Sequence, residues 1–133
     1  MLAAADSSGE VWVWSVDSGA LLRTLTPDSI SLESGQVAWT PDGSQIVESI
    51  WYPNSETSAL VVWGVASGKS QRELRGQEGR FTSLAWKGDT GLLGTGSEDG
   101  SVWLWDISQG QAVTSLTSET PAPILDISFS RGK

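Results

Sequence analysis

The residues that could carry chemistry in this sequence are acidic, and they are not arranged as a catalytic pair. Glu98 and Asp99 are neighbours in the chain rather than carboxylates facing each other across a site. The chain has no Cys and no His, so thiolate ligands, imidazole ligands and a His base for a Ser nucleophile are all absent. No Gly-rich phosphate loop precedes a helix. We therefore predict no catalytic residue, no metal site and no cofactor.

Length, composition and charge limit the classes of protein that this sequence can encode. At 133 residues and 38% hydrophobic content, it can bury the core of one domain. Eight basic and sixteen acidic residues give a net charge of −8, which opposes phosphate binding, so we predict no nucleic-acid partner. No apolar run approaches the roughly 18 residues of a membrane span, and MLAAAD at the N-terminus lacks the features of a signal peptide. We expect a cytoplasmic protein without a membrane partner.

The elements that must position these residues are short strands, written in three repeats. A strand of alternating apolar residues ending in Trp and followed by a Gly-containing turn occurs as EVWVWSVDSGA, ALVVWGVASGK and SVWLWDISQGQ. The anchors Trp14, Trp63 and Trp105 lie 49 and 42 residues apart, close to the period of roughly 40 to 45 residues of four-stranded propeller blades. Eight Trp and fifteen Gly also favour strands and tight turns over helices. The sequence predicts an all-β fold.

A second kind of strand recurs with an aromatic residue at its end. It occurs as GQVAWTPDG, FTSLAWKGDTG and, at the C-terminus, ILDISFSRGK. Two further strand types flank the Trp cassette, so four strand types recur in all. We read the terminal aromatic residues as core. The predicted blade-core aromatics are Trp14, Trp39, Trp63, Trp86 and Phe129.

One stretch of the chain carries a specific resemblance. LLGTGSEDGSVWLWDISQGQAVTSL is similar to a repeat of the WD-repeat β-propeller family, with Asp99-Gly100 in the hairpin turn and Trp105-Asp106 ending the next strand. TPDG at 40–43 and RGQEGRFTSLAW resemble two further segments of the same repeat. The resemblance covers essentially the whole chain. It implies a β-propeller of four-stranded antiparallel blades, with three blades' worth of strands here, acting as a non-catalytic interaction scaffold.

The resemblance also implies a buried polar network in the third repeat. In this family the network links the Trp to a Ser or Thr, to the turn Asp and to a His. Its members here would be Gln77, Thr95, Asp99 and Trp105. The amide of Gln77, at the His position, can accept and donate hydrogen bonds but does not titrate. The first repeat has Ala4 at the Thr position and the second ends Trp63-Gly64, so we expect those two blades to rely more on packing.

The predicted strands add up to three blades, divided unequally along the chain. We expect three strands of a first blade in 1–25, a second blade in 37–74, a third in 81–116 and a spare innermost strand in 124–133. The first blade lacks an innermost strand, so the two ends are complementary. A closed propeller needs about four blades or more. Either the chain is part of a longer propeller, or its spare strand completes the first blade of a second copy.

The resemblance places partner binding on the face whose loops enter the innermost strand or join the second and third strands. These loops hold eight acidic residues and two basic ones, so we call this surface the acidic loop face: Asp6, Asp28, Glu33, Glu56, Glu78, Glu98, Asp99 and Glu119 against Arg75 and Arg80. A surface of one sign steers a basic protein or peptide segment toward itself. The predicted partner-binding residues are Asp28, Glu33, Glu78, Arg80, Glu98 and Glu119. The alternative is a solvated acidic rim that serves solubility.

Two further tryptophans stand two residues before their anchors. Trp12 and Trp103 therefore lie on the same side of the strand as Trp14 and Trp105, at positions where the family often has Arg or Lys. They form either an aromatic recognition surface or part of the packing between blades. We favour packing, because burial is the commoner use of Trp on a sheet that faces another sheet.

Three functions are compatible with these observations. The first is a non-catalytic scaffold that binds a protein or peptide partner through the acidic loop face. The second is a structural role, in which exposed blade faces and unpaired end strands drive self-assembly into a homo-oligomer that closes the ring. An enzyme stands third, since no catalytic constellation supports it.

Overall fold

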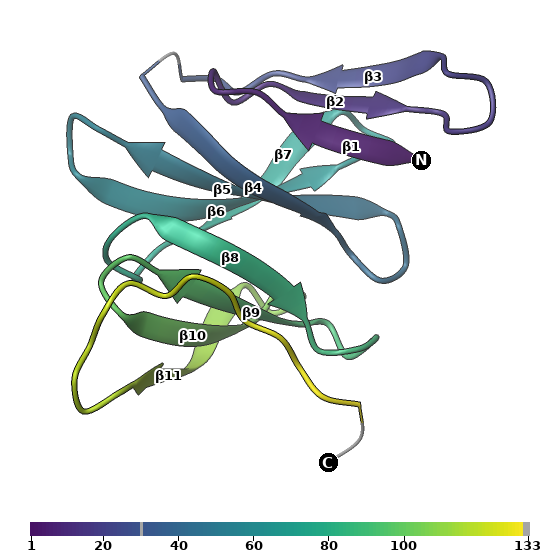
Figure 1. Cartoon of the computed structure of the whole chain (residues 1–133). Helices are drawn as coiled ribbons and strands as arrows, with labels where there is room; N and C mark the ends of the chain where they lie inside the picture. Colours follow the sequence, from purple (N-terminus) through teal and green to yellow (C-terminus); the bar gives the residue numbers. More distant parts are fainter. Residues whose placement is uncertain (30, 132–133) are drawn as a thin grey trace.

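The chain folds into three antiparallel sheets that follow one another in sequence and stack face against face (Figure 1). A computed structural model describes residues 1–29 and 31–131. The first sheet has β1 (Leu2–Ala5), β2 (Val11–Trp14) and β3 (Leu21–Leu25). The second has β4 (Glu33–Trp39), β5 (Gln45–Tyr52), β6 (Thr57–Gly64) and β7 (Lys69–Leu74). The third has β8 (Phe81–Trp86), β9 (Leu92–Ser97), β10 (Ser101–Asp106) and β11 (Gln111–Thr117). The predicted all-β propeller architecture is confirmed.

The Trp cassette produces the same local structure in all three sheets. The register with the following strand shifts immediately before each anchor, between Val13 and Trp14 in the first sheet and at the equivalent steps of the other two. A β-bulge of this kind increases strand twist and re-aims the next side chain. The turn that follows contains Gly19, Gly68 or Gly110 at φ of 70° to 72°, where a side chain would be strained. The cassette thus encodes a bulge, an anchor and a left-handed turn residue.

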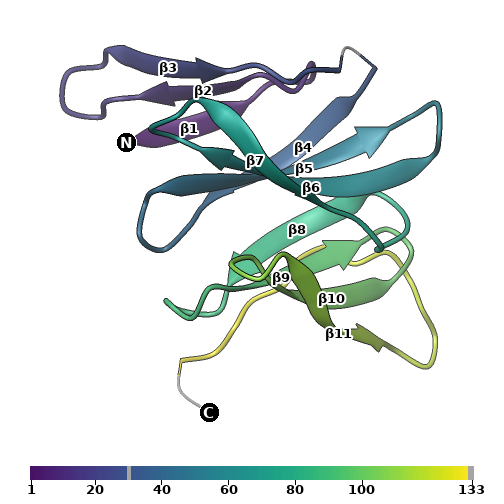
Figure 2. The ribbon, with the colours of Figure 1, turned by 180° about the vertical axis from the view of Figure 1, so that it is seen from behind.

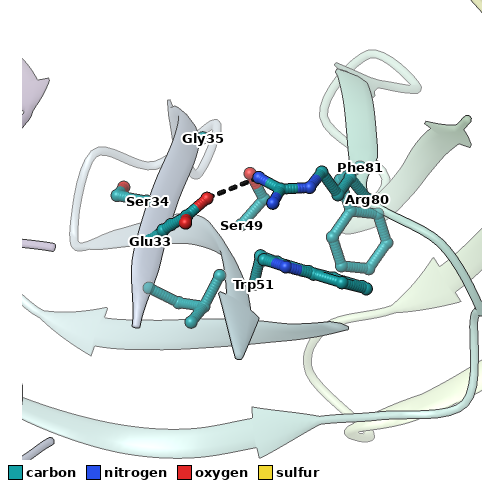
Figure 3. Close-up of a pocket in the computed structure, with 8 residues that line it drawn as sticks. Glu33, Ser34, Gly35, Ser49, Trp51, Arg80 and Phe81 are labelled. Atoms are coloured by element: carbon teal, nitrogen blue, oxygen red, sulfur yellow. Dashed lines mark hydrogen bonds and ion pairs between the residues drawn. The ribbon is translucent and has the colours of Figure 1, made fainter. Parts of the chain in front are cut away.

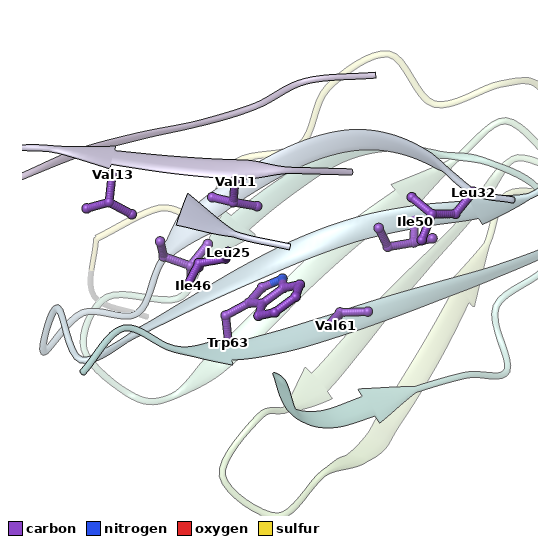
Figure 4. Close-up of a cluster of buried hydrophobic side chains, with 8 residues drawn as sticks. All are labelled: Val11, Val13, Leu25, Leu32, Ile46, Ile50, Val61 and Trp63. Carbon is purple, nitrogen blue, oxygen red and sulfur yellow. The ribbon is translucent and has the colours of Figure 1, made fainter. Parts of the chain in front are cut away.

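Two hydrophobic clusters hold the sheets together. The first lies between the first and second sheets and is built around Val11, Val13, Ile46 and Trp63 (Figure 4). The second lies between the second and third sheets and contains Trp105. At the inner edges, β4 lies against both β1 and β8. Because each anchor faces the preceding sheet, packing against that sheet decides how deeply the anchor is buried.

The blade boundaries differ from those expected at two places. The second sheet begins at Glu33 rather than at residue 37, because a register shift between Ser34 and Val37 lets β4 start earlier. The expected spare strand of 124–133 is not a strand in residues 124–131, and residues 132 and 133 lie outside the described part. Its expected partner, β1, lies at the opposite end of the stack (Figure 2). Within one chain the segment therefore does not pair with β1.

The C-terminal segment instead runs over the outer face of the third sheet, as both views show (Figures 1 and 2). The N–H of Ile124 donates to the carbonyl of Ser97 at 3.0 Å. The side chains of Ile124 and Phe129 lie over Gly96 and Gly94, which leave room for them. Phe129 nevertheless remains 37% exposed, so its prediction as a core residue is wrong, because this side of the segment faces solvent.

Aromatic residues on the first sheet face the open end of the stack. Trp14 is half-buried and Trp12 is 38% exposed, with ring centroids 6.0 Å apart. The expectation of inter-blade packing is therefore wrong for Trp12, because no preceding sheet lies within the chain. It holds for Trp103, which packs against the second cluster and stacks on Trp105. Trp39 and Trp86 are half-buried against the first and second clusters.

Candidate interaction surface

The acidic loop face contains a groove between the second and third sheets. All sheets are antiparallel, so alternate loops gather at the same end of the stack. The groove has a volume of about 560 Å³ and is bordered by Glu56, Glu78 and Glu98, with Arg75 as its one basic lining residue. Three carboxylates from three different loops therefore share one concave surface.

The structure gathers only some of the predicted partner-binding residues. Glu78 and Glu98 lie in the groove, and Glu33 and Arg80 lie together in a smaller adjacent pocket of about 60 Å³. Asp28 borders a separate pocket beside the first sheet. Glu119 is exposed on the segment after β11 and lines neither of these pockets.

The loop before β8, residues 75–80, forms one wall of the groove and is fixed at several points. The hydroxyl of Ser97 donates to the carbonyl of Glu78 at 2.7 Å, and the hydroxyl of Ser58 donates to the carbonyl of Gly79. The N–H of Glu98 donates to the carbonyl of Arg80 at 3.0 Å, and the Arg80 N–H donates to the Glu98 carboxylate at 3.1 Å. These bonds hold the loop backbone, so the groove wall is preformed.

A buried chain of hydrogen bonds lies behind this wall. The indole N–H of Trp105 donates to the Thr95 hydroxyl at 2.9 Å, and that hydroxyl donates to the amide oxygen of Gln77. The Gln77 amide nitrogen donates to the Ser101 hydroxyl at 3.1 Å, and that hydroxyl donates to the Asp99 carboxylate at 2.6 Å. The four residues singled out in the sequence are thus joined through Ser101. Because Gln77 belongs to the 75–80 loop, the network ties the groove wall to the core.

In the second sheet a different residue type accepts the hydrogen bond from the anchor Trp. Glu48 occupies the position of Thr95, since each lies two residues after the partner of its anchor Trp. It is fully buried and accepts hydrogen bonds from the Trp63 indole N–H and the Ser34 hydroxyl, both at 2.7 Å. Burial raises the pKa of the Glu48 carboxyl, the two hydrogen bonds oppose that rise, and the charge of Asp6 adds to it. We expected this blade to rely more on packing, but its anchor Trp63 also has a buried polar partner in Glu48.

The small pocket beside the groove holds a cation in an aromatic and acidic setting. The guanidinium of Arg80 lies 4.9 Å from the ring centroid of Trp51 and donates a hydrogen bond to the carboxylate of Glu33 (Figure 3). Glu33 and Trp51 are directly opposed on β4 and β5, so their side chains project from the same face of the second sheet. Arg80 reaches them from the loop before the third sheet.

Three of these residues were not singled out in the sequence. An ionisable Glu48 inside the apolar strand QIVESIWY is a detectable signal, because a buried carboxyl group needs dedicated partners. Ser101 directly follows Asp-Gly, where a hydroxyl commonly bonds back to the Asp. Trp51 had no such signal, because its role depends on Arg80, 29 positions further along the chain.

Two kinds of feature are absent from the described part of the chain. In residues 1–29 and 31–131, no group of three or more acidic side chains is placed to hold a metal ion. The same residues contain no helix long and apolar enough to cross a membrane.

Comparisons with known proteins agree with this architecture. The model of the "WD domain, G-beta repeat" family matches residues 68–106. Among curated proteins, the chain is 33% identical over 93 residues to cell division cycle 20.5, cofactor of APC complex, from Arabidopsis thaliana, covering 69% of this chain and 19% of that protein. It is 26% identical over 111 residues to anaphase-promoting complex subunit cdc20 from Dictyostelium discoideum, covering 83% and 21%. The chain thus spans about a fifth of the length of these relatives.

Solved structures show the same fold. The RRP9 WD40 repeats superpose with a TM-score of 0.75 at 23% identity, covering 90% of this chain and 36% of that one. A chain of the mitotic checkpoint complex superposes with a TM-score of 0.68 at 21% identity, covering 91% and 37%. Taken with the recurring Trp cassette and the matched repeat, these similarities show that the chain belongs to the WD-repeat β-propeller family.

Proposed function

We propose that this chain is a non-catalytic scaffold that binds a basic protein or peptide segment in the groove of the acidic loop face. The observation that carries the proposal is the convergence of Glu56, Glu78 and Glu98 on one groove of about 560 Å³. All three side chains are exposed, so their charge is available to a partner. The carboxylates of Glu56 and Glu78 are free of the loop hydrogen bonds described above, whereas that of Glu98 also accepts from the Arg80 N–H and that of Asp99 accepts twice from Ser101.

Relatives with the same repeat support a scaffold role. One relative is a subunit of the anaphase-promoting complex, another is a cofactor of the APC complex, and one structural neighbour is a chain of the mitotic checkpoint complex. These associations are with other proteins. For this chain, the three carboxylates of the groove favour a partner segment with several positive charges.

Charge reversal on the two loop faces tests the proposal. The probe is an eight-residue peptide of alternating Arg and Gly, titrated at low salt into the wild-type chain and two double variants. Glu78→Lys with Glu98→Lys should weaken binding by about tenfold or more, because two attractive charges in the groove become repulsive. Asp17→Lys with Asp89→Lys makes the same change in net charge in loops at the opposite end and should have little effect.

The salt dependence of binding provides a second readout. Salt screens the attraction between exposed charges once the Debye length is shorter than the distance between them. The Debye length is about 10 Å at 0.1 M salt. Wild-type binding should therefore fall with added salt more steeply than binding by the groove variant. Equal weakening by the two double variants would show a solvated acidic rim instead of a binding groove.

A second candidate function is self-assembly, which the two outer faces of the stack favour. The first sheet exposes Trp12 and Trp14 beside Ala4, and the segment over the third sheet exposes Phe129. A second copy could cover these faces and pair its β1 with residues 124–129. Sedimentation at micromolar concentration tests this candidate: a twofold mass supports it, and a monomer mass removes it.

A further inference from the structure

The pocket formed by Trp51 and Glu33 is filled from within the chain. Both side chains project from the second sheet, whereas Arg80, which occupies the pocket, comes from the loop that leads to the third sheet. A flat indole face and a carboxylate are the two groups that recognise a guanidinium, by stacking and by charge-assisted hydrogen bonds. The receptor groups and the occupant thus belong to separate elements.

The occupant is held weakly. The side chains of Arg80 and Glu33 are 45% and 47% exposed, so their ion pair is open to water. Exposed pairs of this kind stabilise a protein by about 0 to 1 kcal/mol. Water and salt compete with the contact, so a second guanidinium can compete with it too.

The side chain of Arg80 can leave without disturbing the loop. Its backbone N–H and carbonyl are both bonded to Glu98, and neither bond involves the guanidinium. The neighbouring loop residues Glu78 and Gly79 are anchored independently by Ser97 and Ser58. Release of the side chain therefore leaves the groove wall in place.

The pocket adjoins the surface on which a partner would lie. Trp51 lines both the small pocket and the 560 Å³ groove, so a segment seated in the groove passes within one side-chain length of the indole. The other cation–aromatic pair differs: Arg75 lies 4.8 Å from the ring centroid of Tyr52 and pairs with Glu73, two residues before it. Arg75 and its partners all come from the second sheet or its immediate end.

We propose that Trp51 and Glu33 form a recognition site for an arginine side chain of the partner, and that Arg80 occupies this site until the partner displaces it. The inference rests on the proposed function, because it names the residue type that the basic segment inserts. Arginine fits better than lysine, since a planar guanidinium covers the indole face while bonding the carboxylate, whereas an ammonium is a compact and strongly hydrated charge.

Removal of the occupant tests the proposal directly. The probe is acetyl-Gly-Arg-Gly-amide, titrated into the wild-type chain and Arg80→Ala while the indole N–H signals are followed by NMR, with Trp51 assigned from Trp51→Phe. Binding should tighten about twofold or more in Arg80→Ala, because an internal competitor held by an exposed ion pair and an exposed contact with the indole is removed. The shifted signal should be that of Trp51. Arg80→Gln is the second variant if Arg80→Ala loses its folded spectrum.

Matched controls separate recognition from general charge. Lys87→Ala removes one positive charge in a loop at the opposite end of the stack and should not tighten binding. The same peptide with citrulline in place of Arg has the same shape without the charge and should not bind Arg80→Ala detectably. The gain should disappear when Trp51→Leu is added to Arg80→Ala. Binding by Arg80→Ala no tighter than by Lys87→Ala, or a gain that survives Trp51→Leu, would overturn the proposal.

The results also separate this proposal from the one that it rests on. If the alternating Arg and Gly peptide depends on Glu78 and Glu98 but Arg80→Ala gives no gain, the groove binds basic segments and the arginine site is rejected. If groove reversal has no effect but Arg80→Ala binds the single-Arg peptide through Trp51, the arginine site stands and the groove is rejected.

Discussion

The second and third sheets bury equivalent tryptophans, but the groups that accept a hydrogen bond from the two indoles are of different kinds. In the third, Trp105 donates to a neutral hydroxyl, which is the first member of a relay that ends at the surface carboxylate of Asp99. In the second, Trp63 donates directly to the carboxylate of Glu48, which is itself fully buried. In the third sheet the carboxylate at the end of the relay therefore lies in a surface loop, whereas in the second sheet the carboxyl group lies in the core.

The two kinds of acceptor differ in what their burial costs and in what they are connected to. The neutral relay gives each of its own buried polar groups a partner without desolvating a charge, whereas a buried carboxylate with only two neutral donors is costly to ionise. The relay also reaches Gln77 in the loop that walls the groove, so it couples the core to the candidate interaction surface. Glu48 makes no such link and serves the interface with the first sheet.

The first sheet has neither kind of acceptor for its anchor Trp. Ala4 stands at the position of Thr95 and Glu48 and offers no side-chain acceptor to Trp14. Trp14 also lacks a preceding sheet to pack against. We therefore expect the three anchors to contribute unequally to the free energy of unfolding, with Trp14 contributing least.

Truncation of the anchors should give the largest effects. Trp105→Ala should lower the free energy of unfolding by about 3 to 5 kcal/mol, because a large buried side chain leaves a cavity. Trp14→Ala should cost clearly less, since its ring is only partly buried at the open end of the stack. Urea unfolding of the two variants measures the difference. Equal losses would show that burial within this chain does not set the contribution of an anchor.

Replacement of each anchor by Phe isolates the indole hydrogen bond. Trp63→Phe should cost about 2 kcal/mol or more beyond the lost ring area, because it removes a donor from a buried carboxylate. Trp105→Phe should cost about 1 kcal/mol for a bond between neutral groups, and Trp14→Phe should cost little. Urea unfolding at pH 7 provides the measurement. A larger loss for Trp105→Phe than for Trp63→Phe would show that the hydrogen bond to the neutral hydroxyl contributes more than the one to the carboxylate.

The buried carboxylate of Glu48 should also make the contribution of the second sheet's core depend on pH. Burial raises the pKa of Glu48 above its ordinary value of 4.5, so the folded state binds this proton more tightly than the unfolded state does. Its contribution is therefore favourable below about 4.5 and is lost as pH rises through the raised pKa. Glu48→Gln removes this titration while keeping an acceptor for Trp63.

The measurement is the difference in free energy of unfolding between the wild-type chain and Glu48→Gln from pH 4.5 to 8. Wild type should lose stability relative to the variant by at most about 1.4 kcal/mol per pH unit within the titration window. Using the difference cancels the surface carboxylates of Asp6, Asp42 and Asp106, whose pKa values are lowered by hydrogen bonds to side chains and backbone. A flat difference would mean that Glu48 is not the group that titrates.

The sequence predicts those features that a single repeat encodes locally. The alternating strands and the anchors follow from residue spacing within one repeat. The network of Gln77, Thr95, Asp99 and Trp105 follows from the resemblance of that repeat to the WD-repeat family. The acidic character of the loop face follows in the same way from strand order and antiparallel pairing.

Other features depend on contacts between repeats or on what lies beyond the chain. The meeting of Glu33, Trp51 and Arg80 requires two sheets to pack at a particular distance, which no local pattern specifies. Phe129 and Trp12 have the sequence character of core residues, yet both are exposed because no further sheet covers them here. The sequence predicts which face is apolar, but not whether a neighbour occupies it.

The smallest expected effect concerns the relay itself. Gln77→His should change the free energy of unfolding by less than about 1 kcal/mol at pH 8, because a neutral imidazole has one donor and one acceptor and can serve both Ser101 and Thr95. Below its ordinary pKa of about 6.5, the imidazole becomes a donor at both nitrogens and can no longer accept from Thr95.

Because the site is buried, the folded state should hold the new imidazole neutral, which lowers its pKa relative to the unfolded chain. The unfolded state then binds the proton more tightly, so the stability of Gln77→His should fall as pH decreases through about 6.5 and below. The wild-type chain has no His, so the difference between the two chains reports this residue alone. A constant difference from pH 8 to 5 would show that the relay does not depend on an acceptor at this position, and that the native amide contributes through its donor to Ser101 only.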